Sequence, residues 1–189
     1  MVARVGSGYS LYRMVNYNEK KVTQGAAQCI AAGNYPLDPE NMNMYVKLGC
    51  MQKQMELNQR AKRTSLHISL NFSPTETDLT KEKLSEIADA YMQGIGFGQQ
   101  PYLVYQHYDA GHPHIHIVTT SVREDGTNID TYMIGKLKSE PARKAIENNF
   151  GLVRAEDQGT AQQYRPESVP ASRVNYGRLE TKKAIQNVL

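Results

Sequence analysis

The stretch Ser65-Leu66-His67-Ile68-Ser69-Leu70-Asn71-Phe72 alternates strictly between polar and apolar residues. Successive side chains of an extended chain point to opposite faces, so this period of two predicts a strand with one buried face and one polar face. The Ser73-Pro74 pair ends the strand, because proline has no amide hydrogen to offer a neighbouring strand. Related patterns predict two further strands, at Tyr102–His107 and His114–Val122.

Helical spacing of apolar residues surrounds these strands. It predicts four helices, over residues 10–22, 42–63, 81–92 and 139–149. Thr80 stands at the N-cap of the third helix and Pro141 in the first turn of the fourth, positions that favour these residue types. Asn18 is a polar residue on the apolar stripe of the first helix. A short helix at 26–32, inside a loop, and a short strand at 128–132 complete the expected elements.

The order of the elements indicates the fold class. Helix, helix, strand, helix, strand, strand, helix is not the strict alternation of a parallel doubly wound sheet, and consecutive strands imply hairpins. We therefore expect an α+β fold, with a central antiparallel sheet and helices packed on one face. Residues 1–156 are expected to form the domain, the polar and turn-rich residues 157–172 a linker, and residues 173–189 a helical arm at the start of a truncated region.

Composition narrows the functional classes only a little. The chain of 189 residues carries a net charge of +3, which is compatible with a polyanionic partner but common among enzymes. No apolar run reaches the length of about eighteen residues that a membrane-spanning helix needs, and the N-terminus lacks the apolar core of a secretory signal, so we expect an intracellular protein with no membrane insertion. Cys29 and Cys50 are expected to be reduced and half-buried.

Four of the five histidines lie within ten positions, at 107, 112, 114 and 116. His114 and His116 are two apart on a strand, so both leave the same face, roughly 6.6 Å apart at the backbone. Two imidazoles at this spacing can share an ion about 2.1 Å from each ring nitrogen. Since His112, His114 and His116 would form a row of roughly 13 Å, a third ligand from the neighbouring strand is easier, and His107 ends that strand.

The choice of His107 requires a wide connection over residues 108–113, and Pro113 favours such an irregular segment. His112 is then expected to support a ligand or contact the substrate. Asp109 is expected either to accept the N–H of a liganded imidazole or to take a proton from a nucleophile. His67, alone on its polar strand face, is expected to be a hydrogen-bonded surface residue. Three neutral imidazoles leave positions open on the ion, which indicates a catalytic site.

The order of these features resembles the conjugative relaxases of the HUH endonuclease superfamily, above all the VirD-type relaxases of plasmids and integrative elements. A helix with Val15-Asn16-Tyr17-Asn18-Glu19-Lys20-Lys21-Val22 precedes a strand with Ile68-Ser69-Leu70-Asn71-Phe72, and His107-x-Asp109-x-x-His112-Pro113-His114-Ile115-His116 follows. The resemblance covers roughly residues 1–150 and implies the HUH (ferredoxin-like) palm as the fold.

The resemblance implies that Tyr17 is the nucleophile, with Tyr12 as the alternative, and that His107, His114 and His116 hold Mg²⁺ or Mn²⁺. It implies nicking and rejoining of single-stranded origin-of-transfer DNA through a 5′-phosphotyrosine, together with accessory mobilisation proteins, a coupling protein and a bacterial cytoplasm. DNA phosphates are expected on basic residues near the tyrosine and before the first strand: Arg13, Lys20, Lys21, Arg60, Lys62 and Arg63. Bases are expected to stack on Tyr105, Tyr108 and Tyr132.

Other functions share these histidines. A metal hydrolase would use an activated water without a covalent tyrosine, and a nonenzymatic DNA-binding module would not need the histidines. A rolling-circle replication initiator or a transposase of the same superfamily is a further alternative, but there the tyrosine usually follows the histidines, whereas Tyr17 precedes them here.

Overall fold

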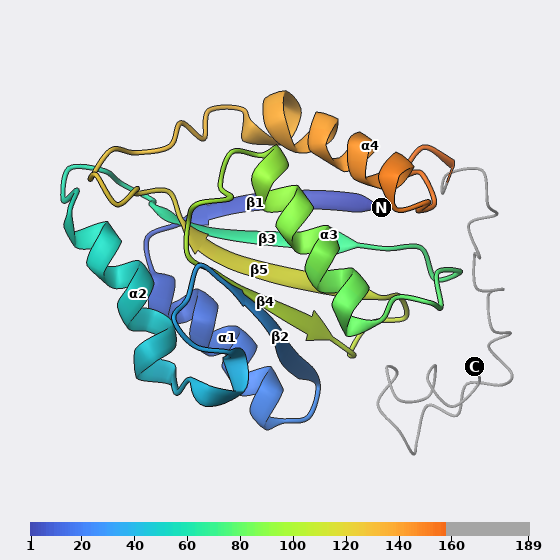
Figure 1. Ribbon diagram of the computed structural model, residues 1–189, viewed down its shortest axis with the longest axis horizontal. Helices are drawn as coiled ribbons and strands as arrows, with labels where there is room; N and C mark the ends of the chain where they lie inside the picture. The colour runs from blue at the N-terminus through green and yellow to red at the C-terminus, as the bar shows by residue number, and fades with distance from the viewer. Residues whose placement is uncertain (158–189) are drawn as a thin grey trace, which may run out of the picture. The chain divides into compact units, whose positions relative to one another are not determined.

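An antiparallel sheet is the centre of the fold (Figure 1). In this computed structural model, which describes residues 1–157, five strands pair in the order β1-β3-β5-β4-β2. The strands of this described region are β1 (Val2–Gly8), β2 (Ala27–Gly33), β3 (Ser65–Asn71), β4 (Tyr102–His107) and β5 (His114–Thr120). Every neighbouring pair is antiparallel, as the sequence predicted.

Four α-helices and two short turns of helix connect these strands within residues 1–157. They are α1 (Leu11–Thr23), η1 (Pro39–Asn41), α2 (Met44–Glu56), α3 (Lys81–Gly94), the π-helical η2 (Gly135–Ser139) and α4 (Glu140–Asn149). Ser10, Asn43 and Thr80 cap α1, α2 and α3, since each side chain accepts from the backbone N–H three residues further on. The predicted cap at Thr80 is thereby confirmed.

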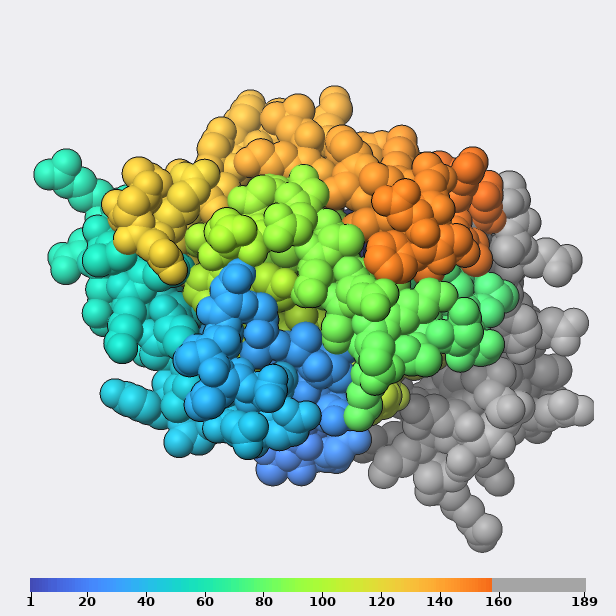
Figure 2. Space-filling model, in the orientation of Figure 1, coloured from blue at the N-terminus to red at the C-terminus, as the bar shows by residue number. Residues whose placement is uncertain are grey.

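The sheet is covered on both faces. On one side α3 and α4 pack on a core that includes Leu66, Ile68, Leu70, Leu84, Ile87 and Ile146. In the space-filling view of Figure 2, α3 and α4 hide much of the sheet. On the other side α1 and α2 enclose a smaller core with Leu11, Val15, Leu48, Met51, Leu103, Tyr105 and Val118. The α+β class and the antiparallel sheet are confirmed, whereas a helix pair covers each face of the sheet and not one face alone, as was expected.

Strand register brings the histidine-bearing positions together. In the β4–β5 hairpin His107 lies opposite His114, and Tyr105 lies opposite His116. On the far side of β5, Ser69 of β3 lies opposite His116. The six-residue connection 108–113 is therefore the wide one that the choice of His107 required.

Two strands were not predicted as such. Residues 26–32 were expected to be helical, but β2 occupies 27–33 and pairs with β4. β1 pairs with β3 and was not anticipated. Both are edge strands, rich in glycine or alanine, so pairing with a neighbour and not local alternation determines their conformation.

Other boundaries differ as well. The second helix ends at Glu56 and not at 63, and Arg63 has a positive φ of 54°. The strand expected at 128–132 is reduced to a single bridge between Val122 and Asn128. Apart from Asp157, the predicted linker (157–172) and arm (173–189) lie outside the described residues. Within the described part of the chain, no helix has the length and apolar character to cross a membrane.

Candidate active site

Three histidines from the β4–β5 hairpin meet on the α1 side of the sheet. His107 ends β4, and His114 and His116 leave the same face of β5. One ring nitrogen from each lies within 4.8 Å of the other two. The ring centroids of His107 and His116 are 4.3 Å apart, and His114 lies 5.4 Å and 5.3 Å from them. The structure thus brings together the three histidines that strand geometry selected as candidate ligands.

Asn18 of α1 determines which nitrogen His107 presents to this group. The Asn18 side chain is fully buried, and its amide nitrogen donates to the Met14 carbonyl at 2.8 Å. Its oxygen therefore faces His107 and accepts from Nε2–H, also at 2.8 Å. With the proton held on Nε2, His107 Nδ1 keeps its lone pair, and this buried atom has no hydrogen-bond partner among residues 1–157.

Backbone contacts orient the second imidazole in the same way. The Nδ1–H of His114 donates to the His112 carbonyl at 3.2 Å, which leaves the lone pair on Nε2. His116 has a buried Nδ1 that bonds to no described residue. A buried nitrogen without a partner is costly in a folded protein, so these unpaired atoms point to a missing ligand.

Burial favours the neutral form of His107 and His116, which metal ligation requires. Loss of solvent contact, with a smaller contribution from the neighbouring His114, lowers the pKa of His107 to about 4. Burial likewise lowers the pKa of His116 to about 3, with a smaller contribution from His67. The oriented lone pairs of His107 and His114, and the unpaired buried nitrogens of His107 and His116, fit a divalent cation held by the three histidines.

Asp109 lies where the two oriented lone pairs converge. Its Oδ1 is 3.7 Å from both His107 Nδ1 and His114 Nε2, too far for a hydrogen bond to either. Its other oxygen accepts a hydrogen bond from the Lys21 ammonium. Asn18 therefore accepts the His107 N–H, which was one of the two roles expected for Asp109. The Asp109 carboxylate instead faces the nitrogens of His107 and His114 that would meet a cation.

Tyr17 packs directly over the histidines. Its ring centroid lies 6.1 Å from that of His107, 6.5 Å from His116 and 6.2 Å from His67. The Lys21 ammonium lies 5.3 Å from the centre of the same ring. The Tyr17 side chain nevertheless remains 47% exposed, so a substrate can approach it.

Tyr12, the alternative nucleophile, is 55% exposed and makes no ring contact with any described histidine. It lies five residues before Tyr17 on α1, which turns its side chain to a different side of the helix. The helix therefore presents Tyr17, and not Tyr12, to the histidine group.

Comparison with known families agrees with this geometry. A model of the MobA/VirD2-like relaxase nuclease domain matches residues 17–152. The chain belongs to this family. It is a DNA relaxase, an endonuclease that nicks DNA, and this family depends on a metal. The resemblance seen in the sequence is therefore confirmed. The matched range begins at Tyr17 and includes the three histidines and Asp109. A search of curated proteins found no match.

Two further histidines of the relaxase, His67 and His112, lie beside this group. His67 stacks on His116 with 4.8 Å between ring centroids, and its Nε2 is buried without a partner among residues 1–157. The expectation of a hydrogen-bonded surface residue is wrong, because α1 passes over the polar face of β3. His112 donates from Nε2 to the Asn71 side-chain oxygen at 3.3 Å, so its backbone supports His114 while its ring is held against β3.

The predicted DNA contacts of the relaxase have different surroundings. The side chains of Arg13, Lys20, Arg60, Lys62 and Arg63 are exposed, whereas that of Lys21 is partly buried. Of the three tyrosines predicted to stack on bases, Tyr108 and Tyr132 are exposed. Tyr105 is fully buried and donates to Glu19 at 2.6 Å, so the prediction that it stacks on bases is wrong.

Asn18 is the site residue that the sequence did not assign. The sequence showed only a polar residue on the apolar stripe of a helix. The crossing of α1 over β4 shows that this residue hydrogen-bonds to His107.

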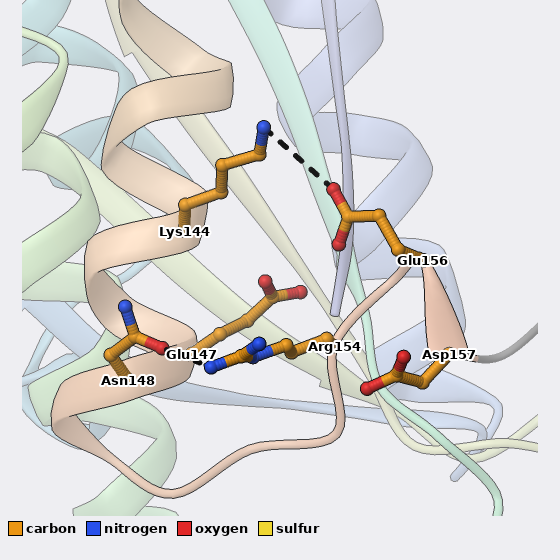
Figure 3. Close-up of a pocket in the computed structure, with 6 residues that line it drawn as sticks. All are labelled: Lys144, Glu147, Asn148, Arg154, Glu156 and Asp157. Carbon is orange, nitrogen blue, oxygen red and sulfur yellow. Dashed lines mark hydrogen bonds and ion pairs between the residues drawn. The ribbon is translucent and has the colours of Figure 1, made fainter.

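A separate cavity of about 370 Å³ lies at the end of α4 (Figure 3). Its lining is charged and includes Lys144 and Glu156, which form an ion pair at 3.9 Å, and none of the histidines borders it. Because α4 packs on the face of the sheet opposite the histidines, this cavity is not part of the nuclease site.

Proposed function

We propose that this relaxase nicks and rejoins one strand at an origin of transfer by transesterification at Tyr17, and so serves the conjugative mobilisation of a plasmid or integrative element. The observation that carries the proposal is the Tyr17 ring, 6.1 Å from His107 and 6.5 Å from His116. A hydrolase that uses water would have no need of an exposed phenol at this position.

The reaction balances without a co-reactant. The Tyr17 phenol oxygen attacks phosphorus and loses its proton, and a bond between phosphorus and tyrosine oxygen forms. The bond from phosphorus to the 3′ oxygen breaks, and that oxygen leaves as a 3′-hydroxyl after taking up a proton. The phosphodiester is exchanged and not hydrolysed, so attack by a 3′-hydroxyl on the phosphotyrosine restores the strand.

We assign the cation to His107, His114 and His116, with Mg²⁺ or Mn²⁺ as its identity. When bound, a divalent ion supplies Lewis-acid stabilisation of the negative charge that develops on the phosphate oxygens. Asn18 orients one of the three imidazoles through its hydrogen bond to Nε2. These preset lone pairs reduce the reorganisation that binding requires.

Lys21 and Asp109 provide charge beside the nucleophile. The hydrogen bond from Lys21 lowers the pKa of Asp109, and burial opposes that shift. A carboxylate with a lowered pKa is a weak base, so we assign Asp109 to the support of positive charge in the site and not to proton removal. The Lys21 ammonium lies 5.3 Å from the Tyr17 ring centre, so it adds positive charge where the phosphate would meet the phenol.

The substrate and partners follow from this chemistry. Single-stranded origin-of-transfer DNA fits a site in which the scissile phosphate must reach a phenol on a helix. Accessory mobilisation proteins and a coupling protein in a bacterial cytoplasm complete the proposal.

A covalent-attachment assay with labelled DNA tests this function. A randomised pool of single-stranded oligonucleotides with a 3′ dye is incubated with the protein and Mn²⁺, then separated on a denaturing gel. We expect dye to migrate with the protein, because the 3′ portion of the strand is the part retained. The same pool with a 5′ dye should release shorter labelled strands. Attachment should be lost in Tyr17→Phe and kept in Tyr12→Phe. Cleavage of both pools without attached dye would instead indicate a hydrolase.

A further inference from the structure

The sheet face that carries the histidines is only partly covered. Among the described elements, α1 and α2 close this face over β2, β4 and β5 with a shared core, and on β3 Tyr17 of α1 also contacts His67. β1 lies at the opposite edge of the sheet, beyond β3. Its pairing places Gly6 opposite His67 and Arg4 opposite Ser69. We call these four residues the open strip.

Side-chain alternation shows that the open strip faces the histidines. Directly opposed residues in an antiparallel pair share a face, so Gly6 shares the face of His67 and Arg4 that of Ser69. Because His67 stacks on His116, this is the face that carries the histidines. Ala3 and Val5, which alternate with the strip residues of β1, pack instead against the core under α3 and α4. Arg4 and Gly6 are exposed, while His67 and Ser69 are partly buried.

Arg4 is a cation without a partner inside the fold. Its guanidinium forms no hydrogen bond or ion pair with any residue from 1 to 157. Arg4 lies opposite Ser69, and Ser69 lies opposite His116, so two strand spacings, about 10 Å in total, separate the backbones of Arg4 and His116. This separation suits a phosphate that neighbours the scissile phosphate along the strand, and guanidinium groups bind phosphate well.

Gly6 has no side chain, so nothing projects from the open strip between Arg4 and Tyr9. A Cβ at this position would meet only the His67 carbonyl oxygen, at 3.5 Å, so the fold itself does not exclude a side chain. Beyond β1, the Tyr9 ring is 76% exposed and Arg63 lies 5.6 Å from its centre. An aromatic ring beside a cation is a surface that nucleotides stack on. The open strip thus leads from the histidines toward an exposed pair of this kind, Tyr9 and Arg63.

We propose that the open strip carries the DNA strand that flanks the scissile phosphate, with Arg4 paired to a backbone phosphate and the strand continuing over Gly6 toward Tyr9 and Arg63. The proposal rests on the proposed function in that single-stranded DNA is the substrate. It adds a path for the strand and a cation that was not among the predicted DNA contacts.

Salt dependence of DNA binding tests the role of Arg4. Binding of a dye-labelled dT oligonucleotide to the full chain is followed by fluorescence anisotropy over a series of salt concentrations, without added metal. Each phosphate contact contributes about 0.7 to the slope of log K against log salt for a single strand. Arg4→Ala should reduce the slope by about 0.7, and Arg4→Lys should retain it. Arg123→Ala removes an exposed arginine from a turn after β5 and should leave it unchanged.

A second variant tests the path independently of charge. Gly6→Val suits a strand and finds space in the fold, so its thermal unfolding should match that of the wild type, while its affinity for the oligonucleotide should fall at least threefold. An unchanged slope in Arg4→Ala, or an equal loss in Arg123→Ala, would overturn the proposal, as would wild-type affinity in Gly6→Val. Absence of Tyr17-dependent attachment would refute the proposed function without altering these binding results.

Discussion

Replacement of Asn18 by alanine is the sharpest test of how the histidines are prepared for a cation. The amide of Asn18 joins the Met14 carbonyl to His107 Nε2, with 2.8 Å on each side. Asn18→Ala removes the acceptor that holds the His107 proton on Nε2. The ring is then free to carry its proton on Nδ1, the nitrogen that faces the other two histidines.

The magnitude follows from the burial of this contact. Asn18 is fully buried and His107 is 3% exposed, so water does not readily replace the lost acceptor. An unpaired buried N–H costs about 1–3 kcal/mol of folding free energy. Loss of a group that orients a metal-binding imidazole typically weakens metal affinity by about tenfold to a hundredfold.

Calorimetric titration with Mn²⁺ and unfolding in guanidinium chloride measure the two effects. Asn16→Ala is the matched control, because it removes the same residue type from the same helix, where the Asn16 side chain bonds to no described residue. We expect Asn18→Ala to lower Mn²⁺ affinity at least tenfold and Asn16→Ala to leave it within twofold. Equal affinities in the two variants would refute the reasoning about the His107 proton.

Three further predictions follow from the charges around the site. Lys21→Met removes the ammonium between Tyr17 and Asp109, so the rate of covalent attachment at saturating DNA should fall by roughly tenfold to a hundredfold; an unchanged rate would exclude a role for the cation in the reaction. Burial lowers the pKa of His107 to about 4 and that of His116 to about 3, below the value of about 6.5 in the unfolded chain, so the unfolded state takes up protons first as the pH falls. Chelator-treated protein should therefore lose unfolding free energy between pH 6.5 and pH 4, and a flat profile from chemical denaturation would contradict this. His67→Phe removes a buried, unpaired nitrogen, so it should raise unfolding free energy by about 1 kcal/mol. It should nevertheless slow attachment, because His67 contacts both His116 and Tyr17; faster or equal attachment would show that His67 only packs.

The predictable part of the fold was the part with a strong local pattern. β3 and β4 alternate or carry continuous apolar residues, and their bounds follow from the sequence within a residue. β1 and β2 carry no such pattern, since Gly6, Gly8 and the alanines of β2 give no periodic signal. Their pairing with β3 and β4 is a tertiary effect that no local window contains.

The site divides in the same way. His114 and His116 are adjacent on one strand face, so spacing alone was sufficient to propose that they share a cation. His67 and Asn18 required the crossing of α1 over the sheet, which brings residues far apart in sequence into contact. The choice between Tyr12 and Tyr17 also depended on that crossing, because a helix alone does not say which of its sides meets the histidines.

Peptide mapping of the covalent product tests the central claim most directly. After reaction with the oligonucleotide pool and Mn²⁺, the protein is digested with nuclease and protease, and the nucleotide adduct is located by mass spectrometry. The account predicts a phosphodiester-linked nucleotide on Tyr17. An adduct on Tyr12 or on another residue, or cleaved DNA without any adduct, would contradict it.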